Sequence, residues 1–128
     1  MTKEQKIEIV DVIRPLLHAL DVSEFKLTEI RCQGFVGINV FSADFDISFY
    51  IESKKWDMHE VYVGWGFRLF CKETRKDVRK LVPIRYFEFG DIKRVLRYMS
   101  PNIAVAATKR YLPQVQDEII EEIKKLKC

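Results

Sequence analysis

The feature that most constrains the fold is a two-residue alternation of apolar side chains in the middle of the chain. Every second residue is apolar from 45 to 51 and again from 61 to 69. Because successive side chains of a β-strand point to opposite faces, this period places the apolar residues of each strand on one face. That face has to be buried against another layer. We therefore predict a sheet whose inward face carries these residues.

Four runs rich in β-branched and aromatic residues are the predicted strands, at 25–31, 35–42, 45–52 and 60–71. Residues 33–34 and 42–44 supply short turns, and a polar loop occupies residues 53–59. Connections this short join antiparallel neighbours. The four strands are therefore predicted to form an antiparallel meander.

Helical periodicity is expected on both sides of this meander. Thr2 and Gln5 have the form of a capping box, and an amphipathic helix follows it to about Leu20. After the fourth strand we predict a short basic helix at 73–81, a fifth strand or extended link at 84–89, and helices at 91–99, 100–112 and 115–126, the last two separated by Pro113. The predicted fold class is α+β in one compact domain of residues 1–128, with an N-terminal helix, the meander and three to four C-terminal helices.

Residue usage argues against several functional classes. Cys32, Cys71 and Cys128 are far apart and show no paired spacing, which indicates free thiols in a reducing compartment. Only His18 and His59 could supply imidazole, so we predict neither a metal site nor a cofactor. No apolar run approaches the ~20 residues that a membrane helix needs. The prediction is a cytoplasmic protein without a membrane segment.

The fourth predicted strand contains GWGFRLF at residues 64–70, which resembles the RNP1 signature of the RNA-recognition motif. In that family the aromatic residues at the positions of Trp65 and Phe67 are exposed and stack on bases. The same orientation here would turn Arg68 toward the core, and burying an unpaired guanidinium is strongly unfavourable. We therefore predict that Trp65 and Phe67 lie in the core with Arg68 near the surface, and we do not assign the chain to that family.

Two glycines in this strand leave a strip of bare backbone on the face opposite Trp65. Glycine within a strand marks a bulge, a bend or the close approach of another element. That element is either a helix of the same protein or the chain of a partner. In the second case the groove is formed by Tyr62, Gly64, Gly66, Arg68 and Phe70.

Positive charge is concentrated after the fourth strand. Residues 72–110 carry 11 basic and 4 acidic side chains, a net charge of +7, in a protein whose net charge is +3. On the predicted helix at 73–81, basic residues recur at four-residue steps and form an outward surface. Such a surface attracts anionic partners. The predicted anion-binding residues are Lys72, Arg75, Lys76, Arg79, Lys80, Arg94 and Arg97.

One string resembles a catalytic motif. Glu52-Ser53-Lys54, with Asp46 upstream, resembles the E-x-K pattern of metal-dependent nucleases. Asp46 and Glu52 fall on one predicted strand, where six residues span about 20 Å. A single ion cannot bridge that distance, because its oxygen ligands lie at ~2.0–2.6 Å. We predict no catalytic residues.

The sequence therefore predicts a non-enzymatic binding module. It engages an anionic partner, either nucleic acid or an acidic protein surface, through a basic helical surface at residues 72–97. A small inhibitor or regulatory protein that acts by protein–protein interaction, such as a phage or bacterial antagonist of a nucleic-acid enzyme, is one alternative. A metal-dependent nuclease is the other.

Overall fold

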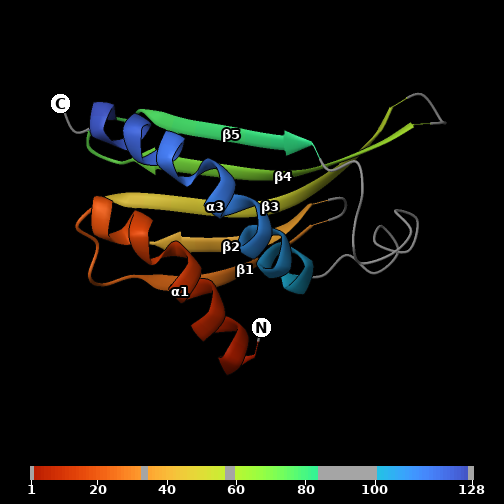
Figure 1. The fold of residues 1–128 in the computed structure, drawn as a ribbon, viewed down its shortest axis with the longest axis horizontal. Coiled ribbons are helices and arrows are strands. Elements are labelled where there is room, and N and C mark those ends of the chain that lie inside the picture. The colour runs from red at the N-terminus through yellow and green to blue at the C-terminus, as the bar shows by residue number, and fades with distance from the viewer. Residues whose placement is uncertain (1, 33–34, 57–59, 84–100, 127–128) are drawn as a thin grey trace.

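The computed structural model describes residues 2–32, 35–56, 60–83 and 101–126 of the 128-residue chain. Its elements are α1 (Lys3–Ala19), β1 (Lys26–Cys32), β2 (Phe35–Phe41), β3 (Phe45–Trp56), β4 (Glu60–Cys71), β5 (Asp77–Pro83) and α3 (Pro101–Leu126). The strands form one sheet in the order β1-β2-β3-β4-β5, with every neighbouring pair antiparallel. Both helices lie on the same side of this sheet (Figure 1). The described architecture is thus a helical layer on one face of an antiparallel meander.

The core lies between these two layers, and the alternation in the sequence explains its composition. Phe49, Trp65 and Phe67 point toward the helices and have no exposed surface. The rings of Phe49 and Phe67 lie 5.5 Å apart, centroid to centroid. Trp65 Nε1 donates a hydrogen bond of 3.0 Å to Oγ1 of Thr108 in α3, so the buried indole N–H is satisfied. The prediction that Trp65 and Phe67 are core residues is confirmed.

The N-terminal helix forms as the sequence predicts. The backbone N–H of Gln5 donates to Thr2 Oγ1 at 3.1 Å, and the backbone N–H of Thr2 donates to Gln5 Oε1 at 2.8 Å. This reciprocal pair is a capping box, which satisfies donors that have no partner inside the helix. Ile9, Ile13 and Leu16 then share the buried face of α1. The helix ends at Ala19, one residue before the predicted end.

The prediction of a basic helix at 73–81 is wrong. The chain turns after Cys71, and residues 77–83 form β5, which pairs with β4 from Gly64 to Phe70. Val78 and Val82 pack against the core from this strand. Ladder hydrogen bonds and this apolar contact outweigh helix propensity, which is worth only a few tenths of a kcal/mol per residue. Lysine at every fourth position therefore did not indicate a helix in this segment.

The prediction of three to four C-terminal helices is also wrong for the described chain. After β5 the structure describes one helix there, α3, which begins at Pro101 as expected but continues through Pro113 to Leu126. Leu112 and Ile119, on either side of Pro113, are both buried, so core contacts hold the two halves as one element. The strand or link predicted at 84–89 and the helix predicted at 91–99 lie outside the described residues.

Neither of the two described helices combines the length and the apolar character that crossing a membrane requires.

Candidate binding face

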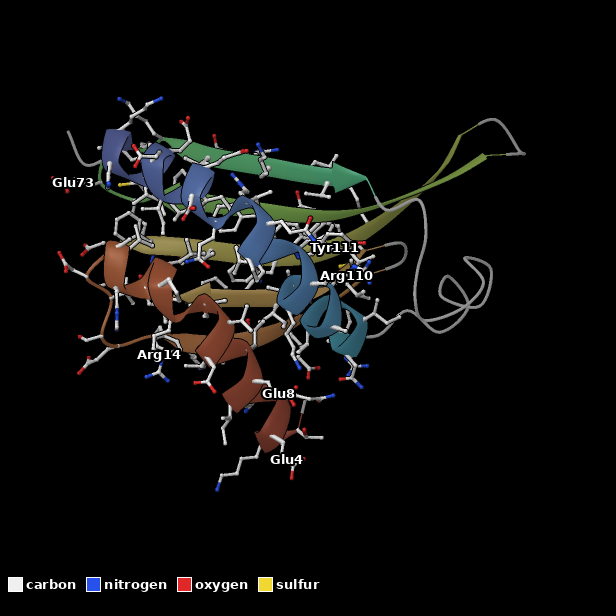
Figure 2. The ribbon with its side chains drawn as sticks, viewed as in Figure 1. Glu4, Glu8, Arg14, Glu73, Arg110 and Tyr111 are labelled. Carbon is white, nitrogen blue, oxygen red and sulfur yellow. The ribbon has the colours of Figure 1, made fainter. Side chains whose placement is uncertain are left out.

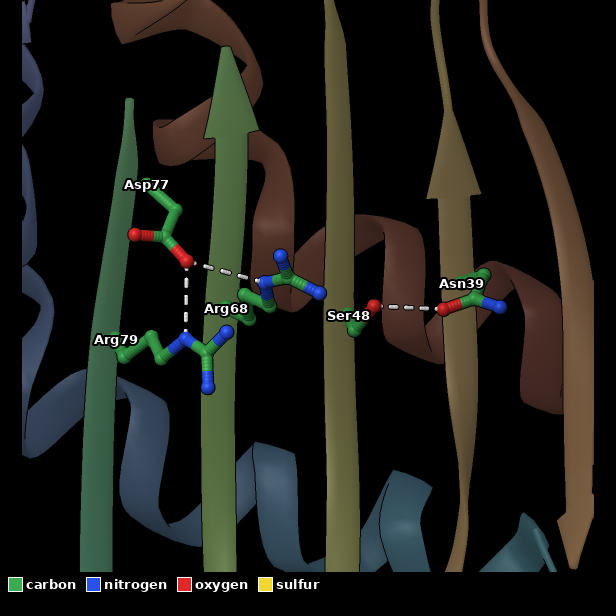
Figure 3. A network of polar contacts seen from close by, with 5 residues as sticks. All are labelled: Asn39, Ser48, Arg68, Asp77 and Arg79. Atoms are coloured by element: carbon green, nitrogen blue, oxygen red, sulfur yellow. Dashed lines mark hydrogen bonds and ion pairs between the residues drawn. The ribbon is translucent and has the colours of Figure 1, made fainter. Parts of the chain in front are cut away.

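The second face of the sheet is the candidate site. Figure 3 shows this face, with the ribbons of both described helices behind the strands. Cross-strand neighbours form rows on it, because directly paired residues point to the same side. One row contains Asn39, Ser48, Arg68 and Arg79 in order across β2, β3, β4 and β5. We call this surface the open face, since neither α1 nor α3 covers it.

The next row explains the glycines of β4. It contains Gly37, Tyr50, Gly66 and Leu81. A Cβ atom at Gly66 would lie 2.2 Å from both Cε2 and Cζ of Tyr50, so the tyrosine ring occupies the space of the missing side chain. A Cβ atom at Gly37 would lie 2.4 Å from the carbonyl oxygen of Phe49. Among the described residues, a tyrosine of β3 rather than a helix therefore covers Gly66.

Tyr50 also forms an aromatic pair on the open face. Its ring stacks on Phe35 with a centroid distance of 4.6 Å and an interplanar angle of 26°. Both side chains are half-buried, as is Phe70 in the row of Asp46 and Asp77. The guanidinium carbon of Arg68 lies 5.9 Å from the centroid of the Phe70 ring, within cation–π range. The open face thus combines aromatic rings with arginine.

A carboxylate links the two arginines of this face. Nε of Arg79 donates to Oδ2 of Asp77 at 2.9 Å, and Nε of Arg68 donates to the same oxygen at 3.3 Å (Figure 3). The bond from Arg79, supported by Arg68, holds the pKa of Asp77 below its usual value. Two guanidinium groups share one carboxylate, so this cluster keeps a net positive charge. The terminal nitrogens of Arg79 extend into solvent, with 64% of its side chain exposed.

The turn between β4 and β5 adds further positive charge at one end of the open face. Arg75 has a φ of 59°, and its backbone N–H donates to the Cys71 carbonyl at 2.9 Å, which closes the turn. Nζ of Lys72 donates to the Ser42 carbonyl at 2.9 Å and lies 3.3 Å from Oδ1 of Asp46. Arg75 and Lys76 are exposed and form no ion pair with any residue that the structure describes. These two cations are available to a partner.

A shallow hollow opens at the same end. It has a volume of about 130 Å³ and is lined by Asp46, Ser48, Arg68 and Phe70. Its lining therefore contains an aromatic ring, a guanidinium and two oxygen-bearing side chains within one small depression. Such a mixture suits a flat, polar-edged group better than an aliphatic one.

Lys80 does not belong to this surface. It points to the helical side of β5 and forms an ion pair with Glu118 of α3. The pair spans a larger groove of about 550 Å³ between β5 and α3, whose other lining residues are Asp77, Val78, Arg79, Ile119, Glu121 and Glu122. The acidic residues of α3 make this groove different in charge from the open face.

The structure therefore divides the predicted anion-binding set. Lys72, Arg75, Lys76 and Arg79 lie in the β4–β5 turn or on the outward face of β5, and Lys80 lies on the opposite face. Arg94 and Arg97 fall outside the described residues. The basic surface is not helical at residues 72–83, because these residues form a turn and a strand.

The predicted groove residues have a definite place. Gly64, Gly66, Arg68 and Phe70 share the outward face of β4, in successive rows, while the side chain of Tyr62 is outside the described part of the chain. Sequence reasoning did not single out Phe35 and Tyr50. The sequence did indicate the orientation of Tyr50, because this residue lies between the inward residues Phe49 and Ile51 and therefore points outward.

The nuclease motif is not assembled as a metal site. Asp46 and Glu52 both belong to β3, as predicted, and pair with Phe70 and Gly64 in different rows. Among the described residues, no group of three His, Cys, Asp or Glu side chains could hold a metal ion.

Comparison of the chain with protein-family models, with curated proteins and with solved structures finds no match in any of the three. The geometry of the open face and the β4–β5 turn is therefore the basis for a functional proposal.

Proposed function

We propose that the protein is a non-enzymatic binding module that engages an anionic partner through the hairpin of β4 and β5. The observation that carries this proposal is the pair of exposed cations, Arg75 and Lys76, at the tip of that hairpin, where they have no ion-pair partner among the described residues. Residues 68–79 contain five basic and two acidic side chains, a net charge of +3. A field of one sign at an exposed turn attracts polyanions.

The partner would be bound by charge and by directed hydrogen bonds. Arg68 and Arg79 present guanidinium groups on the open face beside the turn, and arginine binds oxyanions with two parallel N–H donors. Lys72 is held in place by the Ser42 carbonyl and Asp46, so it would contribute mainly to the local potential. The proposal includes a cytoplasmic location, which stays a prediction from cysteine spacing.

A salt titration with matched variants tests this function. Binding of a fluorescein-labelled oligothymidylate of 16 nucleotides is measured by anisotropy at several salt concentrations. Neutralising both tip cations (Arg75→Gln with Lys76→Gln) should reduce the slope of log affinity against log salt by about 1.4, or about 0.7 for each lost phosphate contact. The proposal fails if the doubly substituted protein keeps the parental slope.

The control removes the same charge from a distant surface. Lys3 and Lys6 are exposed on α1, whose first turn, marked by Glu4, lies far from Glu73 in the β4–β5 turn (Figure 2). Changing both to glutamine should leave the slope and affinity unchanged. Equal losses in both double variants would indicate attraction by overall charge and would contradict a site at the hairpin.

A second candidate function is regulation by protein–protein docking on the open face. The observation that favours it is exposed apolar surface: Leu81 on β5 is 45% exposed, and Phe41 on β2 is 39% exposed. Exposed apolar patches are common at protein interfaces. This candidate predicts capture of a partner whose binding is insensitive to salt.

A further inference from the structure

We propose that the anionic partner is a single-stranded nucleic acid and that its bases stack on the open face, at Phe70 and at the Tyr50–Phe35 pair. This inference rests on the proposed function, because it assigns a class of ligand to the same anion-binding surface. It adds a second site on the protein, the aromatic pair, which lies outside the basic hairpin.

The side chains of the open face follow a definite order along the strands. Moving from the turn along β4, successive rows contain Phe70, then Arg68 with Arg79, then Tyr50, and finally Phe35. Neighbouring rows are two residues apart, so the path from Phe70 to Phe35 covers about 20 Å. The two arginines therefore lie between an aromatic ring at one end and an aromatic pair at the other, with Asp46 and Asp77 in the first row and Glu52 in the last. A single-stranded nucleic acid places an anionic phosphate between flat bases, and the arginines and the flanking rings match that order.

Tyr50 is held close to the sheet. Its ring lies across Gly66 and against Phe35, at 4.6 Å between centroids. A larger residue than glycine at position 66 would displace the ring, so the sequence of β4 keeps an aromatic surface close to the sheet. Aromatic side chains that lie on an antiparallel sheet are suited to stacking with unpaired bases.

The other end of the path lies at Phe70. The hollow of about 130 Å³ beside Phe70 is lined by Arg68, Ser48 and Asp46 as well. A base on Phe70 would therefore meet hydrogen-bonding groups at its edge and the guanidinium of Arg68 near its face. The carboxylates of an acidic protein surface would pair with the arginines, whereas the bases of a nucleic acid would also stack on the aromatic rings.

An oligonucleotide without bases separates this inference from the proposed function. Affinities are measured for oligothymidylate of eight nucleotides and for an abasic oligonucleotide of the same length and charge. Stacking predicts at least tenfold tighter binding of oligothymidylate, since each stacked base contributes about five- to 150-fold. Equal affinities would overturn the inference and leave anion binding intact. Binding of neither would overturn both.

Variants then locate the stacking groups. Tyr50→Leu and Phe35→Leu remove the π-face and keep apolar bulk, and each should lower the affinity for oligothymidylate about fivefold or more while leaving the abasic affinity and the salt slope unchanged. Ile7→Ala is the control, because Ile7 is an apolar side chain that is 56% exposed on α1, in the helical layer on the other side of the sheet. It should change neither affinity.

The folding of each variant is controlled within the experiment, because the affinities for oligothymidylate and for the abasic oligonucleotide are both measured on one protein sample. An unfolded variant loses both affinities, whereas a variant that lacks only stacking loses one. A ratio of these two affinities that stays at the parental value in both Tyr50→Leu and Phe35→Leu would overturn the inference. Polyglutamate that competes as well as oligothymidylate of equal charge would also overturn it, in favour of an acidic protein partner.

Discussion

β3 and β4 present two different faces of one sheet. On the helical side, Phe49 and Trp65 have no exposed surface, and the polar N–H of the indole is paired with Thr108. On the open side, the same strands carry the half-buried Tyr50 and the exposed Arg68, which pairs with the carboxylate of Asp77. The two faces differ in what a substitution should affect: stability on the buried face, and binding on the open one.

The largest expected effect belongs to the buried face. Trp65→Ala should lower the free energy of unfolding by about 3–5 kcal/mol, because it leaves a cavity between the sheet and α3 and removes the hydrogen bond from the indole to Thr108, whose hydroxyl keeps only its bond of 2.7 Å to the Ala104 carbonyl. Phe41→Ala on the open face should cost less, about 1–2 kcal/mol, because 39% of Phe41 is exposed before the change. Urea denaturation measures both. Similar costs for the two substitutions would mean that the two faces are not as different as the structure shows.

A smaller effect distinguishes two glycines of the open face. Gly37→Ala should cost about 1–3 kcal/mol, since the new methyl group meets the backbone oxygen of Phe49, which cannot move without disturbing β3. Gly66→Ala should cost less, because the atoms it meets belong to the ring of Tyr50, which can rotate away. In a Tyr50→Ala background the cost of Gly66→Ala should nearly vanish. Denaturation of the four proteins tests this coupling, and an unchanged cost in that background would contradict the placement of the ring.

The smallest effect is electrostatic. The pKa of Asp77 lies below its usual value because Arg79 donates to it, so the folded protein favours the carboxylate. This interaction contributes stability above the pKa of the unfolded chain, and the contribution is lost as the pH falls through the lower pKa of the folded state. An NMR titration of the Asp77 carboxyl should show this low value, and Arg79→Gln should raise it. A pKa that does not respond to Arg79→Gln would contradict the geometry of Figure 3.

The alternation of apolar residues made the buried face of β3 and β4 predictable. This alternation does not continue past Cys71, which explains why β5 was not predicted as a strand. Trp65 and Phe67 could be assigned to the core because exposing them would have buried Arg68. In residues 77–82 the inward positions are Val78, Lys80 and Val82, so a charged residue interrupts the apolar alternation. The segment then also fits a helix, and only pairing with β4 decides between the two. Local periodicity is ambiguous in short segments of this kind.

The candidate site was predictable only in part, for a related reason. The charge of Arg75 and Lys76 is visible in composition, but their position at the tip of a hairpin depends on a turn closed by Cys71 and a left-handed Arg75. The stacking of Phe35 on Tyr50 depends on the register of β2 with β3, which places Phe35 opposite Glu52 and therefore diagonally next to Tyr50. Register is a property of the assembled sheet, and turn composition alone did not specify it.

NMR observation of side chains during a titration with oligothymidylate of eight nucleotides tests the central claim most directly. The structure predicts that the ring resonances of Tyr50 and Phe35 and the guanidinium resonances of Arg68 and Arg79 shift together, while those of exposed α1 residues such as Ile7 do not. Shifts confined to α1 and α3, with the four open-face side chains unchanged, would contradict the assignment of binding to the open face.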